Sequence, residues 1–152
     1  MKALNPYLNF NGKTEEVFTF YKSIFGGEFA MLMRFKDVPS DVQMDGCVDG
    51  EPDKDESNLI MHVALPIGNN VLMGSDVPGH MPAAVSGNSI TLSINVESKE
   101  EADRVYAALA EGGDAMMPMD IMFWGDYFGM LKDKYDIQWM VNYSQGHQPP
   151  RE

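Results

Sequence analysis

Apolar and polar residues alternate along two stretches of the chain that each run into a helical pattern. Residues 89–96 place apolar side chains at every even position and a hydroxyl or amide at every odd position, which predicts a strand with one buried and one polar face. Residues 4–10 predict an earlier, shorter strand. Behind each strand the apolar period becomes that of a helix, and the two helices end at Gly26–Gly27 and Gly112–Gly113. Ser98 and Glu101 form a capping box before the second helix.

The remaining pattern predicts further strands after each glycine pair. Residues 28–35 alternate with period two, and residues 59–65 and 71–76 flank a turn rich in Pro, Gly and Asn. Residues 114–123 form a weaker strand interrupted by Pro118, which indicates an edge position or a bulge. Residues 123–143 contain both tryptophans and predict a closing hairpin with a charged break at 132–136. A hairpin alone cannot bury its apolar face, so it must pack on the rest of the chain.

The order strand, helix, glycine pair, strand, hairpin therefore occurs twice. Gly26 and Gly112 are 86 residues apart, and the two hairpins match with a shift of about 68. The difference corresponds to residues 37–56, an acidic segment that we interpret as an insertion. We expect one domain over residues 1–152, with module one at 1–78 and module two at 87–144. The predicted fold is α+β: two βαβββ modules forming a cup-shaped mixed sheet, because one helix covers only one face of each sheet.

Composition excludes several classes of partner. The net charge of −12 opposes binding to nucleic acid or an anionic membrane, and no apolar run reaches the length of a membrane span or signal sequence. Cys47 is the only cysteine, which fits a reducing, cytoplasmic environment. Eight acids lie between Lys36 and Glu56. We interpret them as a solvated loop, since they lack the spacing of a calcium-binding loop.

These features together resemble a known superfamily. The paired modules, the helix end Phe20–Tyr21–Lys22–Ser23–Ile24–Phe25–Gly26–Gly27 and the closing hairpin resemble the vicinal oxygen chelate superfamily of glyoxalases, bleomycin-resistance proteins and extradiol dioxygenases. Within it, the chain is similar to the PhnB-like branch, often described as a demethylubiquinone methyltransferase-like domain. The motifs that carry this similarity are Tyr7–Leu8–Asn9–Phe10, Leu72–Met73–Gly74–Ser75–Asp76, Phe123–Trp124–Gly125–Asp126 and Gln138–Trp139–Met140.

The resemblance implies four metal ligands in metal-dependent relatives. Their positions fall near Asn5, Met73, Ser89 and Gln138. Only the last is a residue type that such relatives use, and Asn, Ser and Met are weak ligands for a divalent metal. The sequence thus predicts no bound metal and no cofactor, with a divalent-metal enzyme as the alternative.

The candidate site residues come from strand alternation and from the motifs and ligand positions that the resemblance implies. His62 has two interpretations, a histidine beside the core bonded to a neighbour, or a general base. The thirteen methionines fill core gaps, line an apolar pocket, or do both. The candidate catalytic residues are His62 and Gln138. The candidate ligand-binding residues are Asn5, Tyr7, Asn9, Met73, Ser89, Thr91, Trp124 and Met140.

Two classes of function remain open from the sequence. The first is a homodimeric protein that binds a small organic molecule without metal, for which the negative charge favours a cationic ligand. The second is a glyoxalase-type lyase or a dioxygenase-like metalloenzyme. A methyltransferase is disfavoured, because the Gly-rich strand-to-helix turn of a doubly wound sheet is not evident. The sequence does not identify the ligand.

Overall fold

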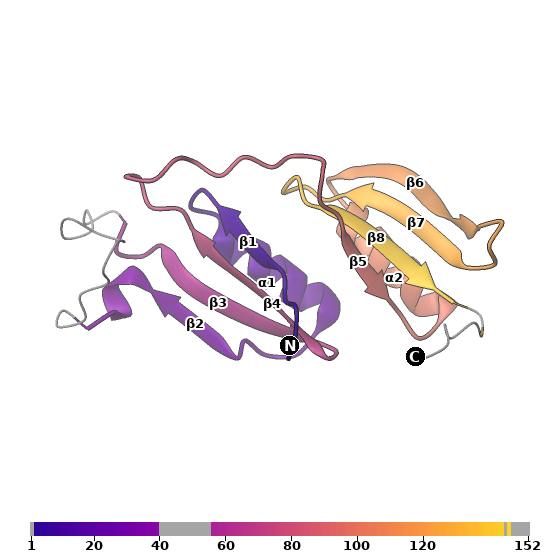
Figure 1. Ribbon diagram of the computed structural model, residues 1–152, viewed down its shortest axis with the longest axis horizontal. Coiled ribbons are helices and arrows are strands. Elements are labelled where there is room, and N and C mark those ends of the chain that lie inside the picture. Colours follow the sequence, from indigo (N-terminus) through magenta and orange to yellow (C-terminus); the bar gives the residue numbers. More distant parts are fainter. Residues whose placement is uncertain (1, 40–55, 145, 147–152) are drawn as a thin grey trace. The chain divides into compact units, whose positions relative to one another are not determined.

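The computed structural model describes residues 2–39, 56–144 and 146. The chain divides into two units, Met1–Val85 and Ser86–Glu152, and each contains one long helix and one four-stranded sheet (Figure 1). The predicted α+β fold of two βαβββ modules is confirmed. Most of the acidic segment and Cys47 lie outside the described residues.

The sheet of the first unit has the strand order β1-β4-β3-β2. Strand β1 runs parallel to β4, whereas β3 pairs with β4 and β2 in antiparallel fashion. A short 3-10 helix, η1, follows β2. The bounds are β1 Tyr7–Phe10, α1 Thr14–Phe25, β2 Met31–Arg34, η1 Phe35–Asp37, β3 Ile60–Ile67 and β4 Asn70–Asp76.

The second unit repeats this topology. Its order is β5-β8-β7-β6, with β5 parallel to β8 and the other pairs antiparallel. The bounds are β5 Leu92–Asn95, α2 Lys99–Ala110, β6 Asp114–Ile121, β7 Tyr127–Lys132 and β8 Gln138–Tyr143. As predicted from Pro118, β6 is an edge strand, and its register shifts on both sides of Met117.

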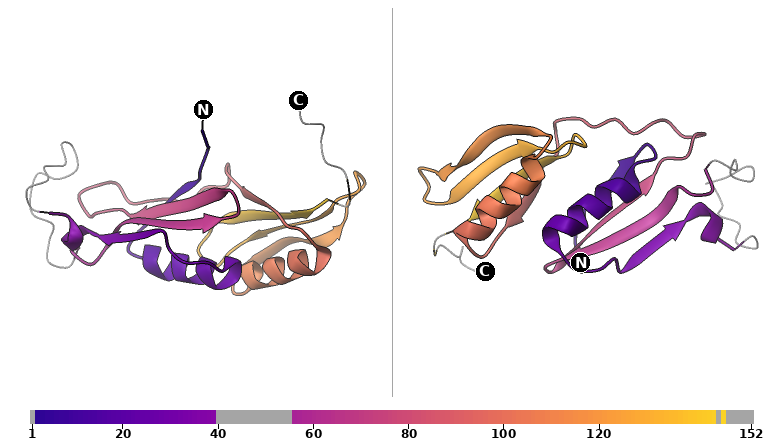
Figure 2. Two further views of the ribbon diagram at one scale, coloured as in Figure 1. Left: turned by 90° about the horizontal axis from the view of Figure 1, so that it is seen from below. Right: turned by 180° about the vertical axis from the view of Figure 1, so that it is seen from behind.

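Each helix covers one face of its own sheet (Figure 2). In the first unit the apolar side chains along one side of α1 are fully or nearly fully buried against alternate residues of β3 and β4. Gly74 belongs to this interface, because a Cβ there would lie 2.7 Å from the ring of Phe18 and 2.8 Å from the carbonyl oxygen of Leu8. The buried residues of this interface include Val17, Phe18, Tyr21, Ile24, Val63, Leu65 and Leu72.

In the second unit α2 packs on β6, β7 and β8. Its capping box is present in part: Glu101 N donates to Ser98 Oγ at 3.1 Å, while the Glu101 carboxylate accepts from Glu97 N. Trp139 is 2% exposed, so this half of the aromatic hairpin belongs to the core, as the alternation predicts. The other buried residues include Ala102, Val105, Leu109, Leu131 and Val141.

Several strand bounds differ from the sequence-based prediction. Strand β5 begins at Leu92, and Ile90 is 77% exposed, so Ser89 and Thr91 lie outside the strand that was expected to start at residue 89. Strand β1 begins at Tyr7 rather than at residue 4, because Pro6 has no N–H to donate to a ladder. Its carbonyl still accepts a bond from Met73 N.

The hairpins also differ in detail. Strand β3 extends through Ile67, so the first turn is shorter than residues 66–70, and the second turn begins after Lys132. The expected strands 28–35 and 114–123 are shorter, at Met31–Arg34 and Asp114–Ile121. Phe123 and Trp124 form the turn between β6 and β7 rather than a strand of the closing hairpin.

None of the helices in the described part of the chain is long and apolar enough to span a membrane.

The registers of the two sheets refine the repeat. In the first unit one row across the strands reads Met31, Ala64, Met73 and Tyr7. In the second the matching row reads Met117, Met130, Met140 and Ser93. The offsets in these rows are 86 for the first and second strand of each unit, 66 for the third and 67 for the fourth.

Candidate functional site

Each sheet has one face that its helix does not cover, and we call these the first and second open faces. Strand alternation assigns residues to them, since neighbours in a strand point to opposite faces. The first open face comprises Tyr7, Asn9, Met31, Met33, His62, Ala64, Met73 and Ser75. The second comprises Ser93, Asn95, Met117, Asp120, Phe128, Met130, Lys132, Gln138, Met140 and Asn142.

The first open face brings together four predicted site residues. Tyr7, on β1, and His62, on β3, share a hydrogen bond of 3.3 Å between the phenolic oxygen and Nδ1. Their rings stack at 5.8 Å between centroids. Met73 is the ladder partner of Tyr7, and Asn9 follows two residues along β1. The side chains are half-buried or exposed, with Tyr7 at 44%, so a solute can reach them.

His62 therefore has a hydrogen-bonded neighbour, which fits the interpretation as a histidine beside the core. It also lies on an accessible face, which fits the interpretation as a general base. A phenol bonded to an imidazole can hold the ring in one orientation and pass a proton to or from it.

Thioethers form the centre of both open faces. Met31 and Met73 flank the small side chain of Ala64 in one row, and Met117, Met130 and Met140 are consecutive across β6, β7 and β8. Amides and hydroxyls border the thioethers on both faces, and the second open face also carries Asp120 and Lys132. Unbranched, polarizable thioethers adapt to irregular ligands, and the polar groups beside them can orient a ligand by hydrogen bonds.

A matching pair of hydrogen bonds joins the first and last strands of each unit. Ser75 Oγ donates to Asn9 Oδ1 at 3.3 Å, and Asn142 Nδ2 donates to Asn95 Oδ1 at 3.1 Å. Asn9 and Asn95 are 86 residues apart, so the two bonds are equivalent in the repeat. They place the amide groups in fixed positions on the open faces.

Asn5 and Gln138 have backbone partners. Asn5 Oδ1 accepts from Val71 N at 3.0 Å, and Gln138 Nε2 donates to the carbonyl oxygen of Ile90 at 3.2 Å. Gln138 is only 8% exposed. Each amide ties the segment before the first strand to the last strand of its unit. The Asn5 oxygen therefore accepts one hydrogen bond from the backbone, whereas the amide of Gln138 is engaged through its nitrogen.

The ligand positions implied by the superfamily do not fit a divalent metal. Met73 offers a thioether, Ser89 is an exposed hydroxyl outside β5, and Asn5 is engaged as described. Within the described residues no group of three or more His, Cys, Asp and Glu could hold a metal ion. His80 lies in an exposed turn after β4, and His147 is outside the described residues.

Two buried carboxylates were not recognised from the sequence. Asp76 is 4% exposed and accepts from Thr14 N, Thr14 Oγ1 and Ile60 N at 2.7 to 3.0 Å. Asp133 is 1% exposed and accepts from Tyr135 N, Ile137 N and Trp139 Nε1 at 2.8 to 3.1 Å. Because donors inside the fold satisfy both carboxylates, we interpret Asp76 and Asp133 as structural groups. The only sequence signal for Asp133 was an acid opening a turn.

The resolved pKa shifts lie away from the open-face residues. The guanidinium of Arg34 donates two hydrogen bonds to the Glu15 carboxylate, which lowers the pKa of Glu15 and raises that of Arg34. The hydrogen bond from Tyr127 to Asp103 raises the pKa of Tyr127 to about 12. Desolvation, with Asp114 nearby, raises the pKa of Tyr106. These groups join helices to strands.

Trp124 lies at the end of the second open face. It is 51% exposed, and Phe123 beside it is 98% exposed. The Trp124 ring meets the ring of Phe128, on the open face, at 5.7 Å between centroids and 69° between planes. Trp124, a predicted site residue, is thus connected through Phe128 to the row formed by Met117, Met130 and Met140. The tryptophan of the core is the other one, Trp139.

The topology places the protein in the glyoxalase/bleomycin resistance/dioxygenase fold. A glyoxalase/bleomycin resistance protein/dioxygenase family enzyme from Burkholderia phytofirmans matches with a TM-score of 0.55 at 17% identity, covering 90% of this chain and 95% of that one. The fosfomycin resistance protein FosX from Listeria monocytogenes matches with a TM-score of 0.59 at 12% identity, covering 93% and 91%. At these identities the similarity concerns the fold.

The family model described as 3-demethylubiquinone-9 3-methyltransferase matches residues 2–142, and the chain belongs to that family, the PhnB-like branch of the vicinal oxygen chelate superfamily. It is 30% identical to Protein YjdN of Escherichia coli K12, over 91% of this chain and 93% of that protein. Protein PA1353 from Pseudomonas aeruginosa is 37% identical with a TM-score of 0.78, covering 93% and 98% of the two chains. These findings confirm the resemblance seen in the sequence.

Proposed function

We propose that the protein binds a small neutral or cationic organic molecule on its open faces. The observation that carries the proposal is the row of thioethers on each open face, bordered by hydrogen-bonding amides and hydroxyls. A face of a sheet that only meets water is usually lined by charged and small polar side chains. Half-exposed methionines with a few fixed polar groups are instead typical of a surface that contacts varied ligands.

The charge of the chain favours the cationic ligands in this class. A net charge of −12 attracts cations by a long-range field and repels anions. The proposal needs no resident metal, since the donor set described above is a poor one for a divalent ion. Elemental analysis of the purified protein tests this part, and one equivalent of zinc, nickel, manganese or iron per chain contradicts it.

The proposal also assigns the protein to the cytoplasm as a homodimer. Among the described residues of each unit, the outermost strands, β1 and β2 or β5 and β6, have one edge without a partner strand, and such edges are commonly covered by association. Light scattering should give about twice the chain mass of 17.0 kDa. A stable monomer would contradict this part without affecting ligand binding.

The methyltransferase named in the family description is not the activity that we propose. A methyl donor such as S-adenosylmethionine is usually bound at a Gly-rich turn between a parallel strand and a helix in a doubly wound sheet. Both sheets are mostly antiparallel, and each carries one long helix on one face. This arrangement offers a different type of binding surface, a broad open sheet.

A second candidate function is a glyoxalase-type reaction on the first open face. It is favoured by the hydrogen bond between Tyr7 and His62, which would let the imidazole act as a general base. In this case His62→Gln should abolish turnover of a substrate while leaving its binding within about threefold. For a binding protein, no turnover is found with the unmodified chain, and His62→Gln changes only affinity.

A thermal-shift screen of small organic molecules tests the main proposal. A ligand at a hundredfold excess over its dissociation constant stabilises the folded state by about 2.7 kcal/mol. Met73→Asn and Met140→Asn, which remove a thioether without adding charge, should each reduce the shift of ligands that bind their face. The matched control is Met81→Asn, which changes a half-exposed methionine in the link outside the sheets. A shift that survives both open-face changes, or an extended screen without a hit, contradicts the proposal.

A further inference from the structure

The turn between β6 and β7 holds three aromatic rings at steep angles to one another. Phe123 and Trp124 have centroids 4.9 Å apart and ring planes at 89°, and Trp124 and Phe128 are 5.7 Å apart at 69°. Perpendicular rings form a corner in which one cation can lie within about 6 Å of two centroids. We call Phe123, Trp124 and Phe128 the aromatic corner.

The aromatic corner lies on a turn whose backbone is held by two hydrogen bonds. Met122 N donates to the carbonyl oxygen of Asp126 at 2.8 Å, and Gly125 N donates to that of Met122 at 2.9 Å. Gly125 has φ of 99°, a conformation that favours glycine. The turn thus fixes the backbone that carries these rings, and the rings are open to solvent, with Phe123 98% and Trp124 51% exposed.

Two carboxylates belong to the same face or turn as the aromatic corner, those of Asp120 and Asp126. Asp120 is the ladder partner of Phe128, so it belongs to the same face, and it is exposed. One of its oxygens accepts from Ile121 N at 2.7 Å, which orients the group. Asp126 lies in the turn, between Trp124 and Phe128 in the chain. Electron-rich ring faces together with carboxylates attract a positive charge.

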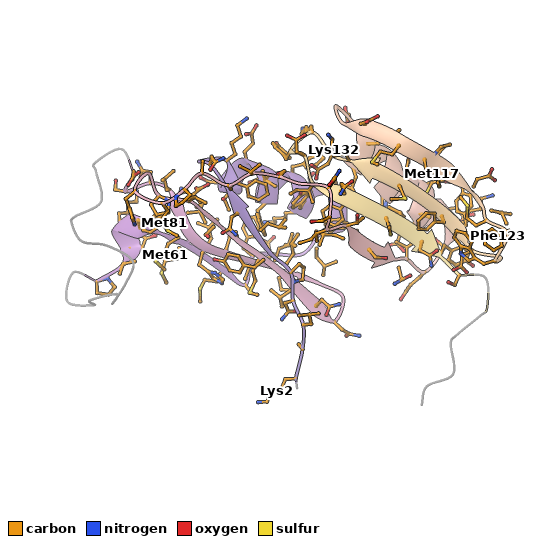
Figure 3. All side chains as sticks on the ribbon, turned by 45° about the horizontal axis from the view of Figure 1, so that its top comes forward. Lys2, Met61, Met81, Met117, Phe123 and Lys132 are labelled. Carbon is orange, nitrogen blue, oxygen red and sulfur yellow. The ribbon has the colours of Figure 1, made fainter. Side chains whose placement is uncertain are left out.

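The lysine on β7, Lys132, does not occupy the aromatic corner. Lys132 follows Phe128 by four residues on β7, which is about 13 Å at the rise of a strand. It also pairs with Asp136, at 3.6 Å between Nζ and Oδ1. Figure 3 shows Phe123 and Lys132 toward opposite ends of this hairpin, with Met117 between them.

We propose that the aromatic corner binds the quaternary or tertiary ammonium group of a small organic cation. The inference rests on the proposed function, because Phe128 and Met130 belong to the same open face, so that the rest of the ligand would extend over the methionine row. An alkylated ammonium fits better than a primary amine. It has few or no N–H groups to satisfy and loses less hydration when it meets aromatic carbon.

Titration with choline and with its uncharged isostere 3,3-dimethylbutan-1-ol tests the proposal. Both have nearly the same shape, and only choline is charged. Trp124 is exposed, whereas Trp139 is buried and bonded to Asp133, so a change in tryptophan emission reports chiefly on the corner. We expect choline to change the emission with saturation, and the isostere to bind at least about tenfold more weakly, as one cation–π contact is lost.

Variants identify the residues responsible. Phe128→Leu and Asp120→Asn should each weaken choline binding by about three- to tenfold. Their controls are Phe29→Leu, which changes a partly exposed phenylalanine of the first unit, and Glu111→Gln, which changes an exposed acid after α2. Both controls should leave the affinity for choline unchanged. Circular dichroism and the melting temperature verify that every variant is folded.

Each outcome separates this inference from the proposed function. Equal binding of choline and its isostere overturns the ammonium site and still supports a small-molecule surface. Absence of choline binding, with neutral hits in the thermal-shift screen, overturns the inference alone. Absence of binding by any ammonium or neutral compound overturns both.

Discussion

The carboxylate of Asp76, the last residue of β4, holds the first residue of α1. Its Oδ1 accepts hydrogen bonds from Thr14 N at 3.0 Å and from Thr14 Oγ1 at 2.7 Å, while Oδ2 accepts from Ile60 N at the start of β3. The residue preceding the helix, Lys13, makes no side-chain cap. The strand end thus replaces a local cap and satisfies a free N–H at the positive end of the helix.

Asp76→Ala should destabilise the protein by about 2 to 4 kcal/mol. The change leaves buried donors without partners, and bonds to a charged group contribute about 1.5 to 3 kcal/mol each, though not additively. Urea unfolding measures the loss. Ser75→Ala, the neighbouring change on the first open face, is the control and should cost less than about 1 kcal/mol. Similar free energies of unfolding for the two variants would contradict this role of Asp76.

Gly74→Ala should destabilise the first unit. The added methyl group would lie 2.7 Å from the Phe18 ring and 2.8 Å from a backbone oxygen, and overpacking of this kind costs about 1 to 3 kcal/mol. Gly87 offers a matched control, since a Cβ there would meet nothing within 4 Å. Thermal unfolding should show a lower melting temperature for Gly74→Ala and none of that loss for Gly87→Ala. Equal melting temperatures would mean that α1 does not press on β4.

Tyr127 should make stability fall at alkaline pH. Its hydrogen bond to Asp103 raises the pKa to about 12, above the usual value of about 10 for an unfolded chain. A raised pKa favours the protonated phenol in the folded state, so this contribution is complete below pH 10 and is lost between about pH 10 and 12. Tyr127→Phe should flatten the decline in unfolding free energy over that range.

The phenol titration itself offers an independent check of Tyr127. Ultraviolet absorbance should show that Asp103→Asn lowers the ionisation midpoint of this residue toward 10. Subtracting the titration curve of Tyr127→Phe isolates the signal from the other tyrosines. A midpoint near 10 in the unmodified protein would remove the assigned role of Asp103.

Much of the fold could be predicted from the sequence because each signal was local. The apolar stripes of α1 and α2, the glycine pairs and the alternation around Trp139 depend on residues close together in the chain. The strand bounds were less accurate, since they depend on partners. Ser89 and Thr91 continue the alternation of β5, yet the ladder begins at Leu92, where β8 provides Trp139 as a partner.

The candidate site was predictable only in part for the same reason. Alternation assigned Met140 to a polar-bordered face and the resemblance supplied Met73, but neither could show that Tyr7 meets His62 or that Gln138 reaches Ile90. These contacts link residues 48 and 55 positions apart. The burial of Asp76 and Asp133 was not predicted, because burial of a carboxylate follows from donors that only the folded chain brings near.

Nuclear magnetic resonance of protein labelled with ¹³C at the methionine methyl groups tests the central claim most directly. A compound that stabilises the protein in the thermal-shift screen should shift methyl signals of the open faces, those of Met31, Met33, Met73, Met117, Met130 and Met140. Met119, whose sulfur lies against Gly129 beside the Tyr106 ring of α2, should stay unchanged. Shifts that spare every open-face methionine, or that concentrate on Met119, would contradict binding at the open faces.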